Sequence, residues 1–281
     1  MPKKSKSKVI NSQDYLMESD DEALRLDVKT DPADLRRQAL WCGVKPGMRV
    51  LDAGCGAGKT TALLYEMVQP DGSAVGVDFS EARISYAIAH YGGRKGIEFH
   101  RRDLRESMTG LGEFDLIWVR FVLEYFRRES SDIVGKLKDC LKPGGTLCLI
   151  DLDYNCLNHY ELPAKIAELL PKIMSYMDEK YNFDTFAGRK LYSYLYDNGF
   201  EKIDVDMMAN NLVFGEIKNQ IQFDWIKKVE IATQKAEKII NTYPGGYDEF
   251  YRDFREFLAN PRRFTYTPLL MCKGMKPFPA D

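Results

Sequence analysis

Short apolar runs alternate with amphipathic segments along the first half of the chain, from residue 35 to about 153. Apolar runs of four to eight residues are typical of buried strands, and apolar residues at helical spacing indicate helices between them. The pattern predicts strands at 48–52, 73–78, 97–101, 114–119 and 146–152, and helices at 60–68, 81–91 and 131–141. Short buried strands that alternate with helices indicate an α/β protein with a parallel sheet covered on both faces.

The pattern changes after residue 153. Apolar residues recur at helical spacing over 162–177 and 216–243, and Tyr and Phe do so over 247–257. A further helix at 189–198 and two strands, at 202–214 and 264–273, complete a mostly parallel sheet of seven strands. The two helical insertions are too small to form independent cores, so we expect helical cap insertions over one edge of the sheet.

Composition excludes several classes of protein. The 281 residues include 40 basic and 42 acidic ones, so no charge excess suggests nucleic acid as a partner. No run approaches the roughly 20 apolar residues that span a bilayer, and the polar start lacks an apolar signal core. Six cysteines without CxxC spacing and three scattered histidines predict reduced thiols and no metal site. We therefore expect a cytoplasmic protein without a nucleic-acid or membrane partner.

A glycine-rich segment at 50–61 carries the most chemical information. A buried strand leads through Gly54, Gly56 and Gly58 into a helix, an arrangement that lets main chain approach a ligand closely. A phosphate-binding P-loop is one interpretation, but its first glycine is missing, since position 53 is alanine. A dinucleotide site is a second, because Asp78 lies 20 residues after Gly58, where an acid can bind ribose hydroxyls.

A third interpretation explains more residues. Asp52-Ala53-Gly54-Cys55-Gly56-Ala57-Gly58, with Asp78 after the second strand, resembles the nucleoside-binding signature of class I S-adenosylmethionine-dependent methyltransferases, small-molecule type. Arg102-Asp103-Leu104, Phe114-Asp115-Leu116-Ile117-Trp118-Val119 and Leu141-Lys142-Pro143-Gly144-Gly145-Thr146-Leu147 continue the resemblance in order along the chain. It implies a Rossmann-like, doubly wound fold and S-adenosylmethionine as cofactor, with S-adenosylhomocysteine as product.

The resemblance also implies roles for residues around that cofactor. Asp52 would lie near its amino-acid end, Asp78 would bind the ribose diol, and Asp103 the adenine amine. The expected cofactor-binding residues are Tyr15, Arg25, Asp52, Gly54, Cys55, Gly56, Asp78, Phe79, Asp103, Leu104, Arg120 and Phe121. The chain is then divided into a tail and cofactor-covering segment (1–34), a cofactor-binding core (35–153), a helical insertion (154–188), a core helix and strand (189–214), a helical cap insertion (215–261) and a closing strand and tail (262–281).

The expected reaction is in-line displacement that moves a methyl group to a small-molecule acceptor, which the aromatic cap residues suggest is partly apolar. His159, Tyr154 and Glu124 are the candidate bases if the acceptor is a hydroxyl, and the sequence does not choose among O, N and C as nucleophile. The alternatives are a non-catalytic S-adenosylmethionine-binding protein and a P-loop nucleotide hydrolase.

Structural roles compete with these ligand roles. Asp52 and Asp103 could serve turns, Asp78 could cap the following helix in competition with Ser80, and Asp115 is expected to bond backbone. If Asp78 binds only ribose, Asp78→Ala should weaken cofactor binding and leave the fold intact.

Overall fold

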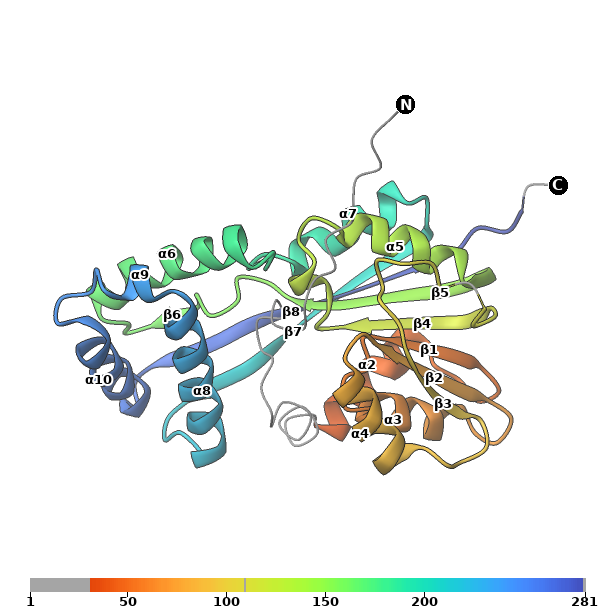
Figure 1. Ribbon diagram of the computed structural model, residues 1–281, viewed down its shortest axis with the longest axis horizontal. Coiled ribbons are helices and arrows are strands. Elements are labelled where there is room, and N and C mark those ends of the chain that lie inside the picture. The colour runs from red at the N-terminus through yellow and green to blue at the C-terminus, as the bar shows by residue number, and fades with distance from the viewer. Residues whose placement is uncertain (1–30, 109, 280–281) are drawn as a thin grey trace.

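A single mixed sheet organises the computed structural model, which describes residues 31–108 and 110–279 (Figure 1). Its strand order is β3-β2-β1-β4-β5-β8-β6, and β7 pairs with β8 as well. The strands are β1 (Arg49–Ala53), β2 (Ser73–Asp78), β3 (Ile97–Arg101), β4 (Phe114–Arg120), β5 (Leu141–Leu152), β6 (His159–Tyr160), β7 (Glu201–Phe214) and β8 (Phe264–Met275). The sheet thus contains the seven expected strands and one more, the two-residue β6.

The first five strands are parallel to one another, and β8 runs antiparallel to β5, β6 and β7. Buried residues of α2 (Pro32–Cys42) and α3 (Lys59–Val68) pack with one face of the central strands. Those of α5 (Ser130–Asp139) and α7 (Leu191–Asp197) pack with the other face. With α4 (Glu81–Tyr91) beside β2 and β3, the sheet is doubly wound, as predicted.

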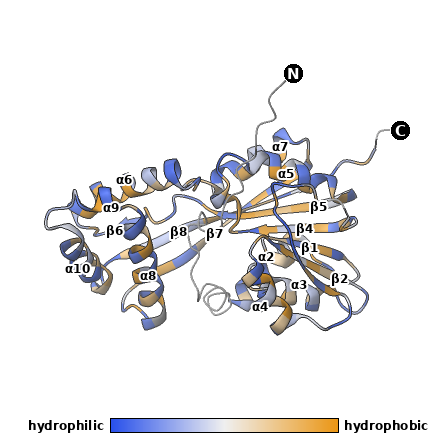
Figure 2. Cartoon of the chain, in the orientation of Figure 1, coloured by the Kyte–Doolittle hydropathy of each residue, from blue (hydrophilic) through white to orange (hydrophobic). Residues whose placement is uncertain are grey.

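The remaining helices form a cap at the far ends of β7 and β8, which extend past the parallel strands (Figure 1). They are α6 (Ala164–Lys180), α8 (Asn219–Lys235), α9 (Glu237–Ile240) and α10 (Gly246–Ala259). Their buried side chains make one apolar cluster separate from those of the sheet. The two insertions thus share a core that neither would form alone. Apolar residues alternate with polar ones along their helices (Figure 2).

Several predicted boundaries differ from the structure, most of all in two helices. The helix expected over 216–243 is interrupted at Ala236, where α8 ends and α9 begins. The helix expected to reach residue 141 ends at Asp139, because Leu141 already pairs with Phe114 at the start of β5. The register shift between Phe114 and Leu116 absorbs the Pro143-Gly144-Gly145 turn, which was expected to precede the strand.

No helix in the part of the chain that the structure describes is long and apolar enough to cross a membrane. Within the same residues, no group of three or more His, Cys, Asp or Glu side chains could hold a metal ion.

Candidate active site

The glycine loop lies between β1 and α3, at the carboxyl end of the parallel strands. The main-chain N–H groups of Gly54 and Cys55 donate to the Val77 carbonyl at 2.8 and 2.9 Å, which fastens the loop to the end of β2. Gly54 has a φ of +84°, and a Cβ there would lie 2.3 Å from Val122 Cγ2. Only glycine therefore fits this close crossing of the two segments.

Asp52 is buried in β1 directly before this loop. Its Oδ2 accepts a hydrogen bond of 2.6 Å from the Thr61 hydroxyl in the first turn of α3. Burial raises the pKa of Asp52 to about 7, an effect that the Thr61 bond and the charge of Arg120 partly offset. The side chain bonds a helix residue and not the glycine turn, so the turn-capping alternative for Asp52 is wrong.

Arg120 ends β4 beside Asp52. Its Nε donates to Gln38 Oε1 at 3.0 Å, and its guanidinium lies 4.1 Å from the centre of the Phe121 ring. Burial lowers the pKa of Arg120 to about 10, although the charge of Asp52 opposes this. A buried carboxylate and a half-buried guanidinium thus lie at the ends of β1 and β4, next to the glycine loop.

Asp78 ends β2 and is bonded on both oxygens. Oδ1 accepts from the Ser80 N–H at 2.9 Å and from Arg83 Nε and Nη2 at 3.1 and 3.0 Å. Oδ2 accepts from the Gly56 N–H at 3.0 Å. Ser80, not Asp78, caps α4, because its side chain accepts from the Arg83 N–H.

The ion pair of Asp78 and Arg83 is almost fully buried. Removing one partner of such a pair leaves an uncompensated buried charge, which is strongly destabilising. The expectation that Asp78→Ala spares the fold is therefore corrected: the loss of this side chain should destabilise the protein as well. Phe79 lies under the same guanidinium, 5.0 Å from its ring centre.

Asp103 and Leu104 follow β3. Both oxygens of Asp103 accept from the Arg105 side chain, and Oδ1 also accepts from the Arg105 N–H at 3.0 Å. Burial alone would raise the pKa of Asp103, but its bonds to Arg105 lower it below the usual value. Asp103 thus has the turn geometry of the structural alternative, and Leu104 is buried beside it. Asp115 accepts from the Arg49 N–H at 2.8 Å, which confirms its structural role.

The three candidate bases differ in burial and in their hydrogen bonds. Glu124 is buried after β4, and its Oε2 accepts from Asn155 Nδ2 at 3.1 Å, which joins the segments after β4 and β5. Tyr154 is 39% exposed and packs beside Phe186. Of the three, Glu124 is held most firmly at the carboxyl edge of the sheet.

His159 lies in β6, at the entrance to the cap. Its Nε2 is 2.9 Å from the Cys156 carbonyl, which can only accept, so Nε2 carries the proton. Its Nδ1 then accepts from the Thr265 hydroxyl at 3.0 Å. Burial lowers the pKa of His159, and both ring nitrogens are occupied, so this side chain is a fixed, neutral wall of the cap.

Sequence reasoning missed two groups of this site. Asp151, buried at the end of β5, accepts from the Glu124 N–H at 3.1 Å on Oδ2. Burial and the neighbouring charge of Glu124 raise the pKa of Asp151 well above its usual value. The second missed group is Arg83. The only sequence signal for its role was its position in the first turn of the helix that follows Asp78. Tyr15 and Arg25, which were expected to cover the cofactor, lie outside the described residues.

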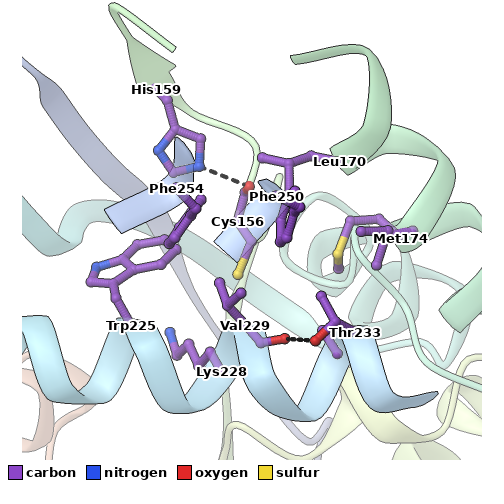
Figure 3. Close-up of a pocket in the computed structure, with 12 residues that line it drawn as sticks. Cys156, His159, Leu170, Met174, Trp225, Lys228, Val229, Thr233, Phe250 and Phe254 are labelled. Atoms are coloured by element: carbon purple, nitrogen blue, oxygen red, sulfur yellow. Dashed lines mark hydrogen bonds between the residues drawn. The ribbon is translucent and has the colours of Figure 1, made fainter. Parts of the chain in front are cut away.

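An apolar cavity of about 50 Å³ lies inside the cap (Figure 3). Cys156 and His159 form one side of it, and Leu170 and Met174 of α6 form another. Trp225, Val229, Lys228 and Thr233 of α8 line a further side, and Phe250 and Phe254 of α10 are part of the same wall. Because Cys156 follows Asn155, the cavity begins one residue from the hydrogen bond that holds Glu124.

The fold and these residues together define a class of protein. A doubly wound sheet places the glycine loop and two strand-terminal acids at the point where strand order reverses, between β1 and β4. Open α/β sheets bind their ligands in this crevice. The arrangement is that of a Rossmann-like protein with a nucleoside-binding site.

Comparison with known proteins narrows the class. The model of a methyltransferase domain family matches residues 44–222. A demethylmenaquinone methyltransferase of Lactococcus lactis is 32% identical over 120 residues, 41% of this chain and 46% of that protein. Phosphoethanolamine N-methyltransferase 3 of Arabidopsis thaliana is 32% identical over 109 residues, 38% of this chain and 22% of that protein. The chain thus spans less than half the length of these curated relatives.

A solved structure agrees with the fold. Phosphoethanolamine N-methyltransferase 2 of Haemonchus contortus, crystallised with S-adenosyl-L-methionine, superposes with a TM-score of 0.56 at 16% identity, over 88% of this chain and 53% of that one. The family model covers more than half of the residues. The chain therefore belongs to the methyltransferase domain family, among the class I S-adenosylmethionine-dependent methyltransferases.

Proposed function

We propose that the protein transfers the methyl group of S-adenosylmethionine to a small-molecule acceptor. The observation that carries the proposal is the pair of acids, Asp52 and Asp78, which end neighbouring strands on either side of the Gly54 crossing. Such a pair suits a ligand with an ammonium group at one end and a ribose diol at the other.

The residues present fit this cofactor. Asp52 would bind the ammonium group in its ionised form, and the main chain at Gly54, Cys55 and Gly56 would lie along the ligand. Asp78 would accept from ribose through Oδ2, because Oδ1 already accepts from three N–H groups. Asp103 and Leu104 would meet the adenine. Arg120 and Phe121 would close the pocket, and Tyr15 and Arg25 would cover it.

When bound, S-adenosylmethionine supplies a methyl group already activated by its sulfonium. The protein's own task is then to align the nucleophile and exclude water. Glu124 is the best-placed residue to take a proton from a hydroxyl acceptor, because it is buried at the sheet edge beside the cavity. His159 holds the cap segment through Cys156 and Thr265, and exposed Tyr154 is the weaker candidate.

The cap would bind the acceptor. Its cavity walls are mostly aromatic and aliphatic, with Lys228 and Thr233 as polar members, which favours a partly apolar molecule. We place the cofactor-binding core at 35–153, the helical insertions at 154–188 and 215–261, and the core elements between and after them at 189–214 and 262–281, with 1–34 covering the cofactor. A cytoplasmic location suits a soluble metabolite as acceptor.

Two measurements on the full chain test the proposal. Calorimetry with S-adenosylhomocysteine should give a saturable heat, and Mg-ATP should give none. Labelled methyl from S-adenosylmethionine should then appear in a metabolite of a cell extract. Binding without any labelled product would favour the non-catalytic alternative, since binding and chemistry are separable. Stabilisation by Mg-ATP alone would favour the P-loop hydrolase.

A further inference from the structure

Buried polar atoms without a hydrogen-bond partner gather on β7, on α8, on β8 and on the residue that precedes β8. Folded proteins contain few such atoms, because burying one loses its hydrogen bonds to water and gains no hydrogen bond within the protein. Among the described residues they are Asn210 Nδ2, Asn211 Nδ2, Trp225 Nε1, Arg263 Nε, Arg263 Nη2 and Thr267 Oγ1, with Trp118 Nε1 elsewhere in the sheet. All of these except the Thr267 hydroxyl can only donate. A ligand that satisfies them must offer oxygen acceptors.

Arg263 is the residue of this set with two unpartnered atoms, whereas the others have one each. It is 1% exposed, and its Nη1 donates to the carbonyls of Gly215 and Asn260 at 2.8 and 3.2 Å. Its Nε and Nη2 have no acceptor, and no carboxylate in the described part of the chain pairs with it. The Nε and Nη2 edge of a guanidinium is one that binds a carboxylate or phosphate with two parallel bonds.

The position of Arg263 connects it to the cap cavity. Two residues along the chain, Thr265 bonds His159, which lines the cavity. Trp225 also lines the cavity, with its ring centre 5.5 Å from that of His159. Thr265 and Thr267 of β8 share a face, because alternate residues of a strand do. Arg263 immediately precedes β8, and burial alternates from it through Thr265 to Thr267, all three of which are buried.

These three residues lead from the cap toward the parallel strands. Thr267 pairs with Asn210 of β7, and Leu269 pairs with Leu152 at the end of β5. Side chains of directly paired residues lie on the same face, so the unpartnered atoms of Asn210 and Thr267 lie on the Arg263 side of the ribbon. Oxygen-binding donors thus run beside an apolar cavity toward the carboxyl edge of the sheet.

We propose that the methyl acceptor is amphipathic and anionic: its carboxylate or phosphate binds the Nε and Nη2 edge of Arg263, and its apolar part fills the cap cavity. This inference rests on the proposed function and adds the substrate class. Trp225 Nε1 and the Asn210 and Thr267 side chains bind further oxygens of the same molecule. A purely structural role for Arg263, tying the turn before α8 to the end of α10, uses only Nη1 and leaves the other two nitrogens unexplained.

Aromatic anions with a neutral analogue test the proposal on the full chain. Phenyl phosphate and benzoate should each raise the melting temperature of the wild type in a saturable way, and benzyl alcohol should not. Arg263→Lys keeps the charge but loses the fork, so its apparent affinity for both anions should fall by about tenfold or more. The matched control is Arg262→Lys, since Arg262 is 76% exposed and bonded to Glu161, and it should bind like the wild type.

Equal stabilisation by benzyl alcohol, no stabilisation by either anion, or unchanged anion affinity in Arg263→Lys would overturn the proposal. If Arg263→Lys does not fold, a wild-type crystal soaked in 4-iodobenzoate decides. The iodine should then give an anomalous peak in the cap cavity, with the carboxylate on Arg263. A carboxylate bound elsewhere, or no bound molecule, would refute the assignment.

Calorimetry with S-adenosylhomocysteine separates this inference from the proposed function. Arg263→Lys should bind that ligand as the wild type does, because Arg263 belongs to the cap and not to the glycine loop. Cofactor binding without any response to the anions would defeat the acceptor assignment alone. Absence of cofactor binding in the wild type would defeat the proposed function, whatever the anions do.

Discussion

Nε and Nη2 of Arg83 both donate to a single oxygen of Asp78, at 3.1 and 3.0 Å. The guanidinium thus fixes the carboxylate at the end of β2 and leaves Oδ2 directed at the Gly56 N–H. An acid held in this way meets a ribose hydroxyl in a preset orientation and pays little entropy on binding.

Arg83→Met should therefore lower both stability and cofactor affinity. Breaking a buried ion pair costs about 3–5 kcal/mol, which denaturant unfolding would measure. The matched control is Arg101→Met, whose exposed pair with Glu81 should contribute less than about 1 kcal/mol. Equal losses in the two variants would contradict the role given to Arg83.

Gly54→Ala should damage the cofactor loop more than a second glycine with similar backbone. Gly54 and Gly93 have φ values of +84° and +79°, so alanine costs about 1–2 kcal/mol of backbone strain at either position. Only at Gly54 does a Cβ also meet Val122, at 2.3 Å, whereas nothing lies within 4 Å at Gly93. Thermal unfolding and S-adenosylhomocysteine affinity should both fall further for Gly54→Ala, and similar losses would refute the close crossing.

The raised pKa of Asp52 makes a pH prediction for stability. The folded protein holds this proton up to a pKa of about 7, and the unfolded chain releases it near the ordinary aspartate pKa of 3.8. The folded state thus binds more protons in that window, so the contribution of Asp52 is complete below pH 4 and is lost as pH rises through 7. The loss is at most about 4 kcal/mol by linkage.

Asp52→Asn removes this titration, because it replaces the carboxyl by a neutral amide of nearly the same shape. The difference in unfolding free energy between wild type and variant should shift in favour of the variant as pH rises from 4 to 8. A difference that stays constant across that range would show that Asp52 is not a buried, protonated acid in the free protein.

The same proton affects cofactor binding in the opposite sense. Asp52 must be ionised to attract an ammonium group, so wild-type affinity for S-adenosylhomocysteine should increase between pH 6 and pH 8. Calorimetry at several pH values measures this directly, and Asp52→Asn, with weaker binding, should show a flatter profile. A wild-type affinity that falls over this interval would argue against Asp52 at the amino end.

Glu124→Gln and His159→Asn distinguish the candidate bases. General bases contribute about 10²–10⁴-fold to rate, so Glu124→Gln should reduce labelled methyl transfer to a hydroxyl acceptor by at least 100-fold. His159→Asn should lose stability through the Thr265 bond and retain most of its turnover per folded molecule. The reverse pattern would move the base to His159.

The sequence was informative where local signals and the global fold agree. Strand 73–78 and helix 81–91 were predicted with their observed bounds, because the acid, the Ser80 cap and the apolar stripe all point to one boundary. The interruption at Ala236 was not predictable, since alanine is a good helix former and only packing in the cap core ends α8 there.

For the site, too, the sequence predicted what depends on strand order and motif spacing, but not what depends on side-chain packing. Motif spacing placed Asp52, Gly54 and Asp78 together correctly, since parallel strands end at one edge. It could not reveal that Arg83 pairs with Asp78, that Arg105 occupies Asp103, or that His159 is bonded on both nitrogens, because these depend on side-chain orientation. The shared core of the two insertions likewise arises from long-range packing that no local pattern encodes.

The central claim is that the acids ending β1 and β2 bind the nucleoside of S-adenosylmethionine. Its most direct test is calorimetric titration of S-adenosylhomocysteine into wild type and into Asp78→Asn, a near-isosteric change that keeps a ribose acceptor but removes the charge. We predict saturable binding at one site per chain in the wild type and at least about tenfold weaker binding in the variant, the loss of one charge-assisted bond. No heat in the wild type, or equal affinity in a folded Asp78→Asn, would contradict it.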